Sequence, residues 1–343
     1  MALVRFSLCV ACVALCGGLS ACSDVPMATN IQQAQATAST SERLADGTFR
    51  DTFLYDEFET RAAVDVLIID DNSDSMRNKE LKLGPRLDSF LGSLGKIDWQ
   101  IGITTTDTSD GTYGLKGSLL PIAGTSSSIL TKNVANYQTA FNDTIVRKEA
   151  LDCQNDCPST DERPLLATIE AIQKRDSDNA GFFRPGAELA VIILSDEDEA
   201  SVGGPDATQP QAVVDAFNSA FGSDKSMIGF GIIVKPGDTA CFAKETLVGA
   251  HYGNTHAAFV QLTGGVLGSI CDDDYGPALA SIGKMVREGI KTAILSAFPS
   301  PDTLQVVVTP PDSTLTWTLV ENRLTFNHPP KPGTQIVVSY KPQ

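Results

Sequence analysis

Three nearly continuous apolar runs constrain the fold more than any other feature of the sequence. They cover residues 64–69, 189–194 and 227–234. Runs of this length without alternation are typical of strands that are covered on both faces. Between and after them, apolar residues recur at helical spacing. Strands that alternate with amphipathic helices predict an α/β fold with a doubly wound, mostly parallel sheet.

The pattern changes after about residue 298. Eight of the 18 prolines lie between Pro299 and Pro342, and the helical periodicity stops. Apolar residues there alternate with polar ones, as around Trp317 and Val338, which predicts strands. We therefore expect an α/β domain at 62–297 and a small C-terminal all-β module at 298–343. A module this short buries little core of its own, so it is expected to pack on the first domain or on a partner.

The N-terminus has the composition of an export signal. One cation, Arg5, precedes an uncharged apolar stretch at 6–15, and small residues then lead to Cys22. The stretch is shorter than the roughly 20 residues that a membrane-spanning helix needs. The sequence LSAC at 19–22 resembles the lipobox of bacterial lipoproteins, which implies removal of the signal peptide at 1–21 and lipidation of Cys22. An ordinary signal peptide that ends near a cysteine is the alternative.

The segment after the signal differs from the rest of the chain. Residues 23–48 are dominated by Ala, Thr, Ser and Gln and lack apolar periodicity. Such composition is typical of flexible linkers. We expect residues 22–61 to form a flexible tether that leads into the α/β domain.

Composition excludes two classes of protein. Hydrophobic residues make up 42% of the chain and charged residues 20%, which fits a globular chain with a core and excludes both a wholly disordered chain and a polytopic membrane protein. The 42 acidic residues against 26 Lys and Arg give a formal charge of -16, which would repel a phosphate backbone. Nucleic acid is therefore not an expected partner.

Cysteine usage also fits an exported chain. Once the signal is removed and Cys22 carries lipid, an even number of cysteines remains in an oxidising setting, which favours disulfides. Four cysteines allow three pairings, and we favour the two in which each pair lies within one loop or connection. These are Cys153–Cys157 and Cys241–Cys271. A zinc site built from these cysteines, or from His251 and His256, is the alternative, although the spacings are not those of a zinc module.

Polar side chains follow two of the buried runs where each strand is predicted to end. Asp71, Ser73 and Ser75 occupy alternate positions after the first run, and Asp196 follows the second. Sites in open α/β sheets lie where the strands end and the loops diverge. Ligands that are all oxygen suit a hard divalent cation, Mg²⁺ first and Mn²⁺ or Ca²⁺ next. The serines could instead be ordinary turn residues.

The sequence VDVLIIDDNSDSM at 64–76 resembles the start of a von Willebrand factor type A domain. In that family a metal-ion-dependent adhesion site uses Asp-x-Ser-x-Ser, a threonine from a second loop, and an aspartate after a central strand. Counting back from the helix expected near Pro164 places the second-loop hydroxyl at Ser159, with Thr160 as the alternate. The resemblance thus implies as metal ligands Asp71, Ser73, Ser75, Ser159 and Asp196.

The resemblance covers about residues 62–293, and bacterial lipoproteins of this type are the members most like this chain. Asp74 departs from the pattern, because glycine usually holds this position. Other polar residues have structural interpretations. Ser159 or Thr160 with Glu162 could cap the helix near Pro164. Residues 197–199 are expected to form a solvated acidic loop and Asp70 to support the strand end, while the histidines are expected to be surface or packing residues.

The resemblance implies binding and not catalysis. In the family the protein holds the ion incompletely, and a carboxylate from a protein partner completes the coordination. We therefore expect a divalent-cation-dependent adhesion module anchored in the bacterial cell envelope, with Ser23 after the lipidated cysteine favouring the outer membrane. One alternative is a structural envelope lipoprotein with a stabilising or vestigial metal site. The other is a metal-dependent hydrolase, but Asp70-Asp71 lacks the expected motif and the sequence shows no positioned base.

Overall fold

The computed structural model describes residues 35–37, 40–55, 63–95, 97–149, 157–185, 187–222, 225–288, 292–320, 322–328, 330–331 and 333–343. The predicted signal at 1–21, the predicted lipidation site Cys22 and the cysteine Cys153 lie outside the described residues. In the described part of the chain, no helix is both long enough and apolar enough to cross a membrane.

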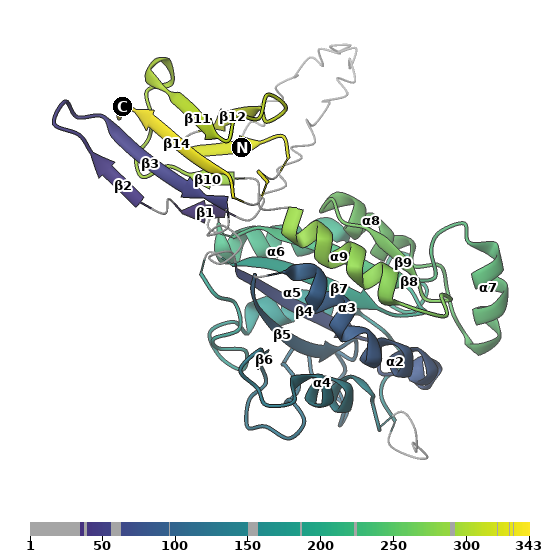
Figure 1. Ribbon diagram of the computed structural model, residues 1–343. Coiled ribbons are helices and arrows are strands. Elements are labelled where there is room, and N and C mark those ends of the chain that lie inside the picture. The colour runs from purple at the N-terminus through teal and green to yellow at the C-terminus, as the bar shows by residue number, and fades with distance from the viewer. Residues whose placement is uncertain are drawn as a thin grey trace, which may run out of the picture. The chain divides into compact units, whose positions relative to one another are not determined.

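A six-stranded, mostly parallel sheet forms the centre of the α/β domain (Figure 1). Its strand order is β6-β5-β4-β7-β8-β9, and β6 alone runs antiparallel to its neighbour. The strands are β4 (Ala63–Asp70), β5 (Asp98–Thr105), β6 (Leu130–Thr131), β7 (Glu188–Leu194), β8 (Met227–Ile233) and β9 (Leu267–Ser269). The three apolar runs are the three adjacent central strands β4, β7 and β8, which confirms the predicted mixed α/β fold with a mostly parallel sheet.

Helices cover both faces of this sheet, which is why its central strands are mostly apolar on both faces. Alternate residues of β4 face two different cores: Ile68 belongs to the core that includes residues of α3 and α9, and Ile69 to the core that includes residues of α5, α6 and α8. The helices are α2 (Arg77–Leu83), α3 (Leu87–Leu94), α4 (Tyr137–Ile145), α5 (Pro164–Gln173), α6 (Pro210–Phe221), α7 (Thr239–Glu245), α8 (Asn254–Leu262) and α9 (Gly276–Glu288).

The apolar strand β4 contains one charged residue in its interior, Asp65, which is fully buried. Arg184 Nε donates to Asp65 Oδ1 over 2.7 Å, and Lys225 Nζ donates to Asp65 Oδ2 over 2.6 Å. A buried carboxylate is tolerated when it is paired and hydrogen-bonded in this way. Asp65 therefore serves the fold at the edge of the sheet opposite to the ends of β4 and β7.

The remaining strands form two four-stranded sheets, ordered β1-β10-β13-β12 and β11-β14-β3-β2. All pairs in them are antiparallel except β1 with β10. The strands are β1 (Gln35–Thr37), β2 (Thr40–Arg43), β3 (Phe49–Leu54), β10 (Thr292–Ile294), β11 (Gln305–Thr309), β12 (Trp317–Val320), β13 (Arg323–Phe326) and β14 (Gln335–Tyr340). The C-terminal all-β module is thus present, and it begins at β10, a few residues before position 298.

The expectation of a flexible tether over 22–61 is wrong for residues 40–55. Strand β3 pairs with β14 along its whole length, from Phe49 opposite Tyr340 to Leu54 opposite Gln335. Two side chains on β3 that point inward, Asp51 and Phe53, are fully buried. β14 pairs with β11 on one side, and β3 pairs with the other side, which would otherwise be an open edge. A segment near the N-terminus therefore completes the C-terminal module.

One predicted disulfide is confirmed. Cys241 in α7 bonds to Cys271, which lies two residues beyond the end of β9, and the two are 30 residues apart in sequence. Cys157 is also disulfide-bonded. Because Cys153 lies outside the described residues, the pairing of these two stays a prediction.

Candidate functional site

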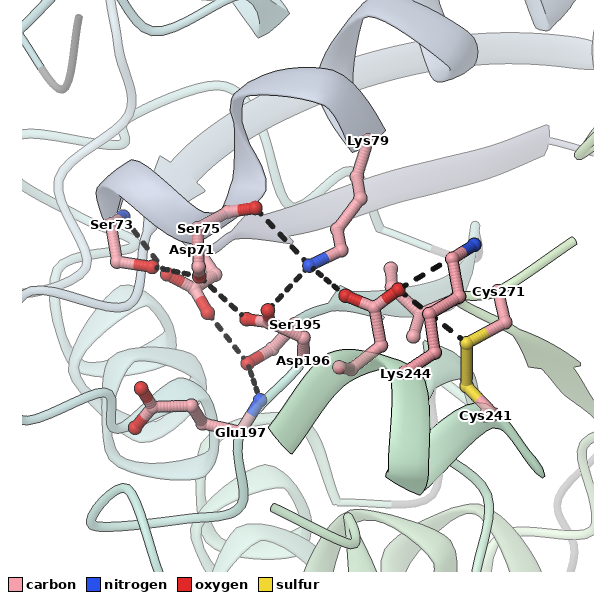
Figure 2. Close-up of polar contacts among 12 residues, drawn as sticks. Asp71, Ser73, Ser75, Lys79, Ser195, Asp196, Glu197, Cys241, Lys244 and Cys271 are labelled. Atoms are coloured by element: carbon pink, nitrogen blue, oxygen red, sulfur yellow. Dashed lines mark hydrogen bonds and ion pairs between the residues drawn. A yellow bond between two sulfur atoms is a disulfide. The ribbon is translucent and has the colours of Figure 1, made fainter. Parts of the chain in front are cut away.

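The ends of two adjacent parallel strands bring the predicted ligands together. Asp70, the last residue of β4, pairs in register with Leu194, the last residue of β7. Just beyond, the Asp71 backbone N–H donates to the Leu194 carbonyl over 3.0 Å. Asp71 and Asp196 are therefore neighbours at the carboxyl edge of the sheet although they are far apart in sequence (Figure 2).

Three side-chain oxygens from the two strand ends form a continuous chain of contacts. Ser73 Oγ lies 2.9 Å from Ser75 Oγ, and Ser75 Oγ donates to Asp196 Oδ1, also over 2.9 Å. In an octahedral shell with metal–oxygen distances of about 2.1 Å, neighbouring ligand oxygens are about 3.0 Å apart. The spacing of these three oxygens therefore fits adjacent ligands of one Mg²⁺ or Mn²⁺ ion.

Asp71 is held in a fixed orientation beside these oxygens. Its Oδ1 accepts from the Ser73 backbone N–H over 2.9 Å, and its Oδ2 accepts from Ser195 Oγ over 2.7 Å. The side chain is fully buried. Burial, followed by the charges of Glu162 and Asp196, raises the pKa of Asp71 to about 7. Near neutral pH this carboxyl is therefore present in both its protonated and its deprotonated form, and a cation bound there would displace the proton into solvent.

A lysine that the sequence gave no reason to single out lies in the same site. Lys79 of α2 places its Nζ 2.5 Å from Asp196 Oδ2 and 2.8 Å from Glu245 Oε2, and it donates to the Ser75 carbonyl over 3.1 Å. Burial lowers the pKa of Lys79, but its contacts with the two carboxylates outweigh burial and leave the pKa above its ordinary value. Asp196 therefore accepts from Ser75 through Oδ1 and from the Lys79 ammonium through Oδ2.

The second loop places a different residue inward from the one predicted. Ser159 Oγ accepts from the Asp161 backbone N–H over 3.0 Å, in a turn, and Thr160 is exposed. Among the contacts of the described residues, no hydrogen bond joins the Ser159 or Thr160 side chain to Asp71, Ser73 or Ser75. The role of these two hydroxyls in metal binding stays a prediction.

Glu162, which follows Ser159 and Thr160 in the same loop, is buried near the site. It is 1% exposed, and its Oε2 accepts from Ser201 Oγ over 2.7 Å while its Oε1 has no hydrogen-bond partner. Burial, followed by the neighbouring Glu197 carboxyl, raises the pKa of Glu162 to about 9. Its charge in turn acts on Asp71. Sequence reasoning assigned Glu162 to a helix cap, and its burial gave no local signal.

The expectation of a solvated acidic loop at 197–199 is wrong for two of its three residues. Glu199 is fully buried and accepts from the backbone N–H groups of Leu165 and Leu166, over 2.7 and 3.2 Å, at the start of α5. Asp198 is 2% exposed and accepts from the Thr255 backbone N–H over 3.0 Å at the start of α8. Carboxylates are favoured at helix N-termini, so these two acids fix α5 and α8 and do not face a ligand.

The donor set defines which ion the site could hold. Among the described residues, no group of three His, Cys, Asp or Glu side chains could hold a metal ion. A cation at this edge would therefore need the hydroxyls of Ser73 and Ser75 besides Asp71 and Asp196. Hydroxyl and carboxylate oxygens suit a hard cation and not zinc or copper. Asp74, the departure from the family pattern, is exposed and does not crowd these oxygens.

Comparisons with known proteins found solved structures that are similar to this chain at low sequence identity. No protein-family model matches the chain, and no curated protein matches it either. The open conformation of the pilus adhesin SpaC from Lactobacillus rhamnosus GG is 11% identical, with a TM-score of 0.39 over 88% of this chain and 41% of that chain. Proximal thread matrix protein 1 from the mussel byssus is 12% identical, with a TM-score of 0.39 over 72% of this chain and 49% of that chain.

The human COPII-coat protein Sec24c is 10% identical, with a TM-score of 0.36 over 86% of this chain and 41% of that chain. This chain thus spans less than half the length of each of these three structures. Similarity at this level assigns neither a fold family nor a function.

Proposed function

We propose that the chain is a lipid-anchored binding module of the von Willebrand factor type A kind, in which a divalent cation mediates adhesion to a protein. Asp71, Ser73, Ser75 and Asp196 would hold Mg²⁺, or Mn²⁺ or Ca²⁺ in its place. A second-loop residue, predicted as Ser159 or Thr160, would add a ligand. The observation that carries the proposal is the 2.9 Å spacing of Ser73 Oγ, Ser75 Oγ and Asp196 Oδ1.

The charge balance of the site favours a ligand that brings its own carboxylate. Two of the three spaced oxygens are neutral hydroxyls, so they do little to neutralise a divalent cation. Lys79 already compensates Asp196, since its Nζ lies 2.5 Å from Oδ2. A bound cation would therefore keep much of its positive charge. An exposed Asp or Glu side chain of a protein partner is the group that such a cation attracts most strongly.

The placement of the module at the membrane rests on the sequence alone. Lipidation of Cys22 would anchor the mature chain in the bacterial envelope, and Ser23 favours the outer membrane. Residues 22–34 and 38–39 lie outside the described residues. Because strands begin by residue 40, any tether must be shorter than the whole 22–61 segment.

Calorimetric titration of the purified chain with Mg²⁺, Mn²⁺ and Ca²⁺ tests the proposed ion site. We expect saturable Mg²⁺ and Mn²⁺ binding that Ser75→Ala weakens at least tenfold, because it removes the hydroxyl that contacts both Ser73 and Asp196. Asp88→Asn, which removes an exposed acid on α3, is the matched control and should bind as the parent chain does. Equal Mg²⁺ affinity in the parent chain and in Ser75→Ala would refute the site.

A second candidate function is that of a structural envelope lipoprotein whose metal site is stabilising or vestigial. The ion pair between Lys79 and Asp196 favours it, because an internal cation already compensates this carboxylate. Water-proton relaxation of bound Mn²⁺ separates the two. An adhesion site keeps water on the ion, and acetate or an aspartyl peptide should displace that water. A closed structural site should show neither effect.

A metal-dependent hydrolase has the least support of the three. The hint for it was the Asp70-Asp71 strand end, where one carboxylate would attack a substrate. Asp70 is fully buried, and its neighbour Ile68 on the same side of β4 lies in the core. A nucleophile needs access to its substrate, so Asp70 is not placed for this role.

A further inference from the structure

A second group of buried polar side chains lies on the other side of β4 from Asp71. Successive residues of a strand point to opposite faces, so Asp70 shares the face of Ile68 and not that of Ile69. Asp70 is fully buried, and both of its carboxylate oxygens lack a hydrogen-bond partner. An isolated buried carboxylate costs several kcal/mol unless something pairs with it.

Three further buried residues carry side-chain oxygens without a hydrogen-bond partner: Thr105, Glu80 and Asn72. Thr105 on β5 is its register partner, so the two side chains lie side by side on one face, and Thr105 Oγ1 has no hydrogen-bond partner. Glu80 of α2 is fully buried; its Oε2 accepts from the Arg147 backbone N–H over 2.8 Å and its Oε1 has no partner. Asn72, two residues beyond Asp70, is 1% exposed and its amide has no partner.

The two acids of this group are close enough to act on each other but do not share a proton. After burial, the charge of Glu80 is the largest influence that raises the pKa of Asp70 above its ordinary value. Neither Asp70 oxygen forms a hydrogen bond with Glu80 Oε1, since all three atoms are unpartnered. A proton shared between the acids would need a hydrogen-bonding distance of about 2.5–2.7 Å. A small cation could instead contact both carboxylates at once.

The surface offers a route to this group. A pocket of about 350 Å³ is lined in part by Glu80, Gly84, Asn142, Val146 and Lys148. Glu80 thus lines this pocket, and its charge also acts on Asp70. A metal site needs such a path from solvent besides its ligands.

We propose that Asp70, Glu80 and Thr105, with the amide oxygen of Asn72, form a second divalent-cation site whose ion is Ca²⁺. Ca²⁺ accepts six to eight oxygen ligands in flexible geometry, including bidentate carboxylates and amide oxygens, whereas Mg²⁺ needs a near-ideal octahedron. This ion would join the end of β4 to α2, the helix that follows Ser73 and Ser75 and carries Lys79. The site does not depend on the proposed function, because it shares no ligand with the adhesion site.

Calcium titration of the full chain, followed by calorimetry and by thermal unfolding, tests the second site. We expect saturable Ca²⁺ binding and a rise in Tm for the parent chain. The double variant Asp70→Asn/Glu80→Gln should lose at least tenfold in Ca²⁺ affinity and should lose the rise in Tm. It replaces both acids by amides of equal size, and the new amide oxygen at position 80 can still accept from the Arg147 backbone N–H, so the variant should fold. If it does not, Thr105→Val is expected to weaken Ca²⁺ binding at least threefold.

Two further variants keep this inference separate from the adhesion site. Glu149→Gln removes a nearby carboxylate that is paired with Arg147, over 2.6 Å, and should change Ca²⁺ affinity less than threefold. Ser75→Ala should keep the Ca²⁺ binding that Asp70 and Glu80 provide, even if Mg²⁺ binding is lost. Absence of saturable Ca²⁺ binding in the parent chain, or unchanged binding in the double variant, would overturn the second site. Loss of Ca²⁺ binding in Ser75→Ala alone would overturn it as well, and would support the adhesion site.

Discussion

Lys79 and Asp196 form a buried ion pair in which Nζ lies 2.5 Å from Oδ2, while the other oxygen of the same carboxylate accepts from Ser75. The ammonium and the proposed metal would thus lie on opposite sides of one carboxylate. An ammonium carries one charge and a divalent cation two, so the two compete electrostatically for Asp196. In the proposed site, the lysine would therefore weaken the attraction of Asp196 for a metal ion.

Replacement of this lysine should make the protein less stable and more avid for metal. Lys79→Met leaves Asp196 buried without its partner, which typically lowers the free energy of unfolding by about 3–5 kcal/mol. The loss of a neighbouring positive charge should raise Mg²⁺ affinity roughly tenfold. Urea unfolding with and without Mg²⁺ measures both effects. Lys82→Met on the same helix is the control, and an unchanged or weaker Mg²⁺ affinity in Lys79→Met would contradict the competition.

Without metal, stability should fall as the pH rises. The folded-state pKa is about 7 for Asp71 and about 9 for Glu162, both above the values of about 4 expected in the unfolded chain. The folded state then binds more protons than the unfolded state, so the free energy of unfolding declines between about pH 4 and 9. With these two pKa values we expect a loss of roughly 5 kcal/mol between pH 5.5 and 8 in the presence of chelator.

Saturating Mg²⁺ should reduce this dependence, because the ion binds the deprotonated form of Asp71. For the same reason, Mg²⁺ affinity should fall as the pH drops below about 7. Urea unfolding at four pH values, with chelator or with Mg²⁺, checks both statements. Stability that increases with pH in chelator would show that the two carboxyls are not buried in their acid form.

A pair of substitutions can show which residue of the second loop supplies the proposed metal ligand. Glu162 is buried with one free carboxylate oxygen, whereas Ser159 uses its hydroxyl in a turn. If Glu162 supplies the ligand, Glu162→Gln should weaken Mg²⁺ binding more than tenfold and Ser159→Ala less than twofold. The reverse order would assign the ligand to the predicted serine. Titration of both variants against the parent chain gives the answer.

The disulfide between Cys241 and Cys271 should contribute strongly to stability. It closes a loop of 30 residues, and a loop of that length corresponds to about 3–4 kcal/mol of unfolded-state entropy. The double variant Cys241→Ala/Cys271→Ala should therefore lose about this much in denaturant unfolding. A change below 1 kcal/mol would mean that the unfolded chain is already restricted in this region.

The β-module depends on a contact between its N-terminal and C-terminal strands. Asp51 of β3 is fully buried, and its Oδ2 accepts from Tyr340 Oη of β14 over 2.7 Å and from the Ser296 backbone N–H over 2.8 Å. Tyr340→Phe removes one donor to a buried carboxylate and should lower the free energy of unfolding by about 1–3 kcal/mol. Tyr113→Phe is the control at a half-buried tyrosine outside the module. Equal losses in the two variants would argue against this contact.

The sequence predicts the sheet because its evidence is local. The runs that became β4, β7 and β8 are apolar except for Asp65, and the strand ends that carry Asp71 and Asp196 follow directly from the first two. The same reasoning failed for β3. Its sequence, FRDTFL, follows a polar stretch, and only pairing with β14, almost 300 residues later, makes it a strand.

Sequence reasoning missed some residues of the site for the same reason: their partners are distant in the sequence. Lys79 lies in α2 and Glu162 just before α5, and charged residues at such positions are usually exposed. Their burial comes from partners in other elements: Asp196 and Glu245 for the lysine, and Ser201 for the glutamate. In the sequence, Glu199 likewise looks like one of a run of exposed acids, and only its contact with the start of α5 explains its burial. Contacts of this kind cannot be inferred from spacing along the chain.

Anomalous diffraction from crystals of the chain grown with Mn²⁺ tests the central claim most directly. Mn²⁺ shares the ligand preference of Mg²⁺ and scatters anomalously. We expect a peak within about 2.1–2.3 Å of Ser73 Oγ and Ser75 Oγ, beside Asp71 and Asp196. No peak at this position, with Ser75 still hydrogen-bonded to Asp196 at saturating Mn²⁺, would contradict a metal-dependent site and leave Lys79 as the cation that compensates Asp196.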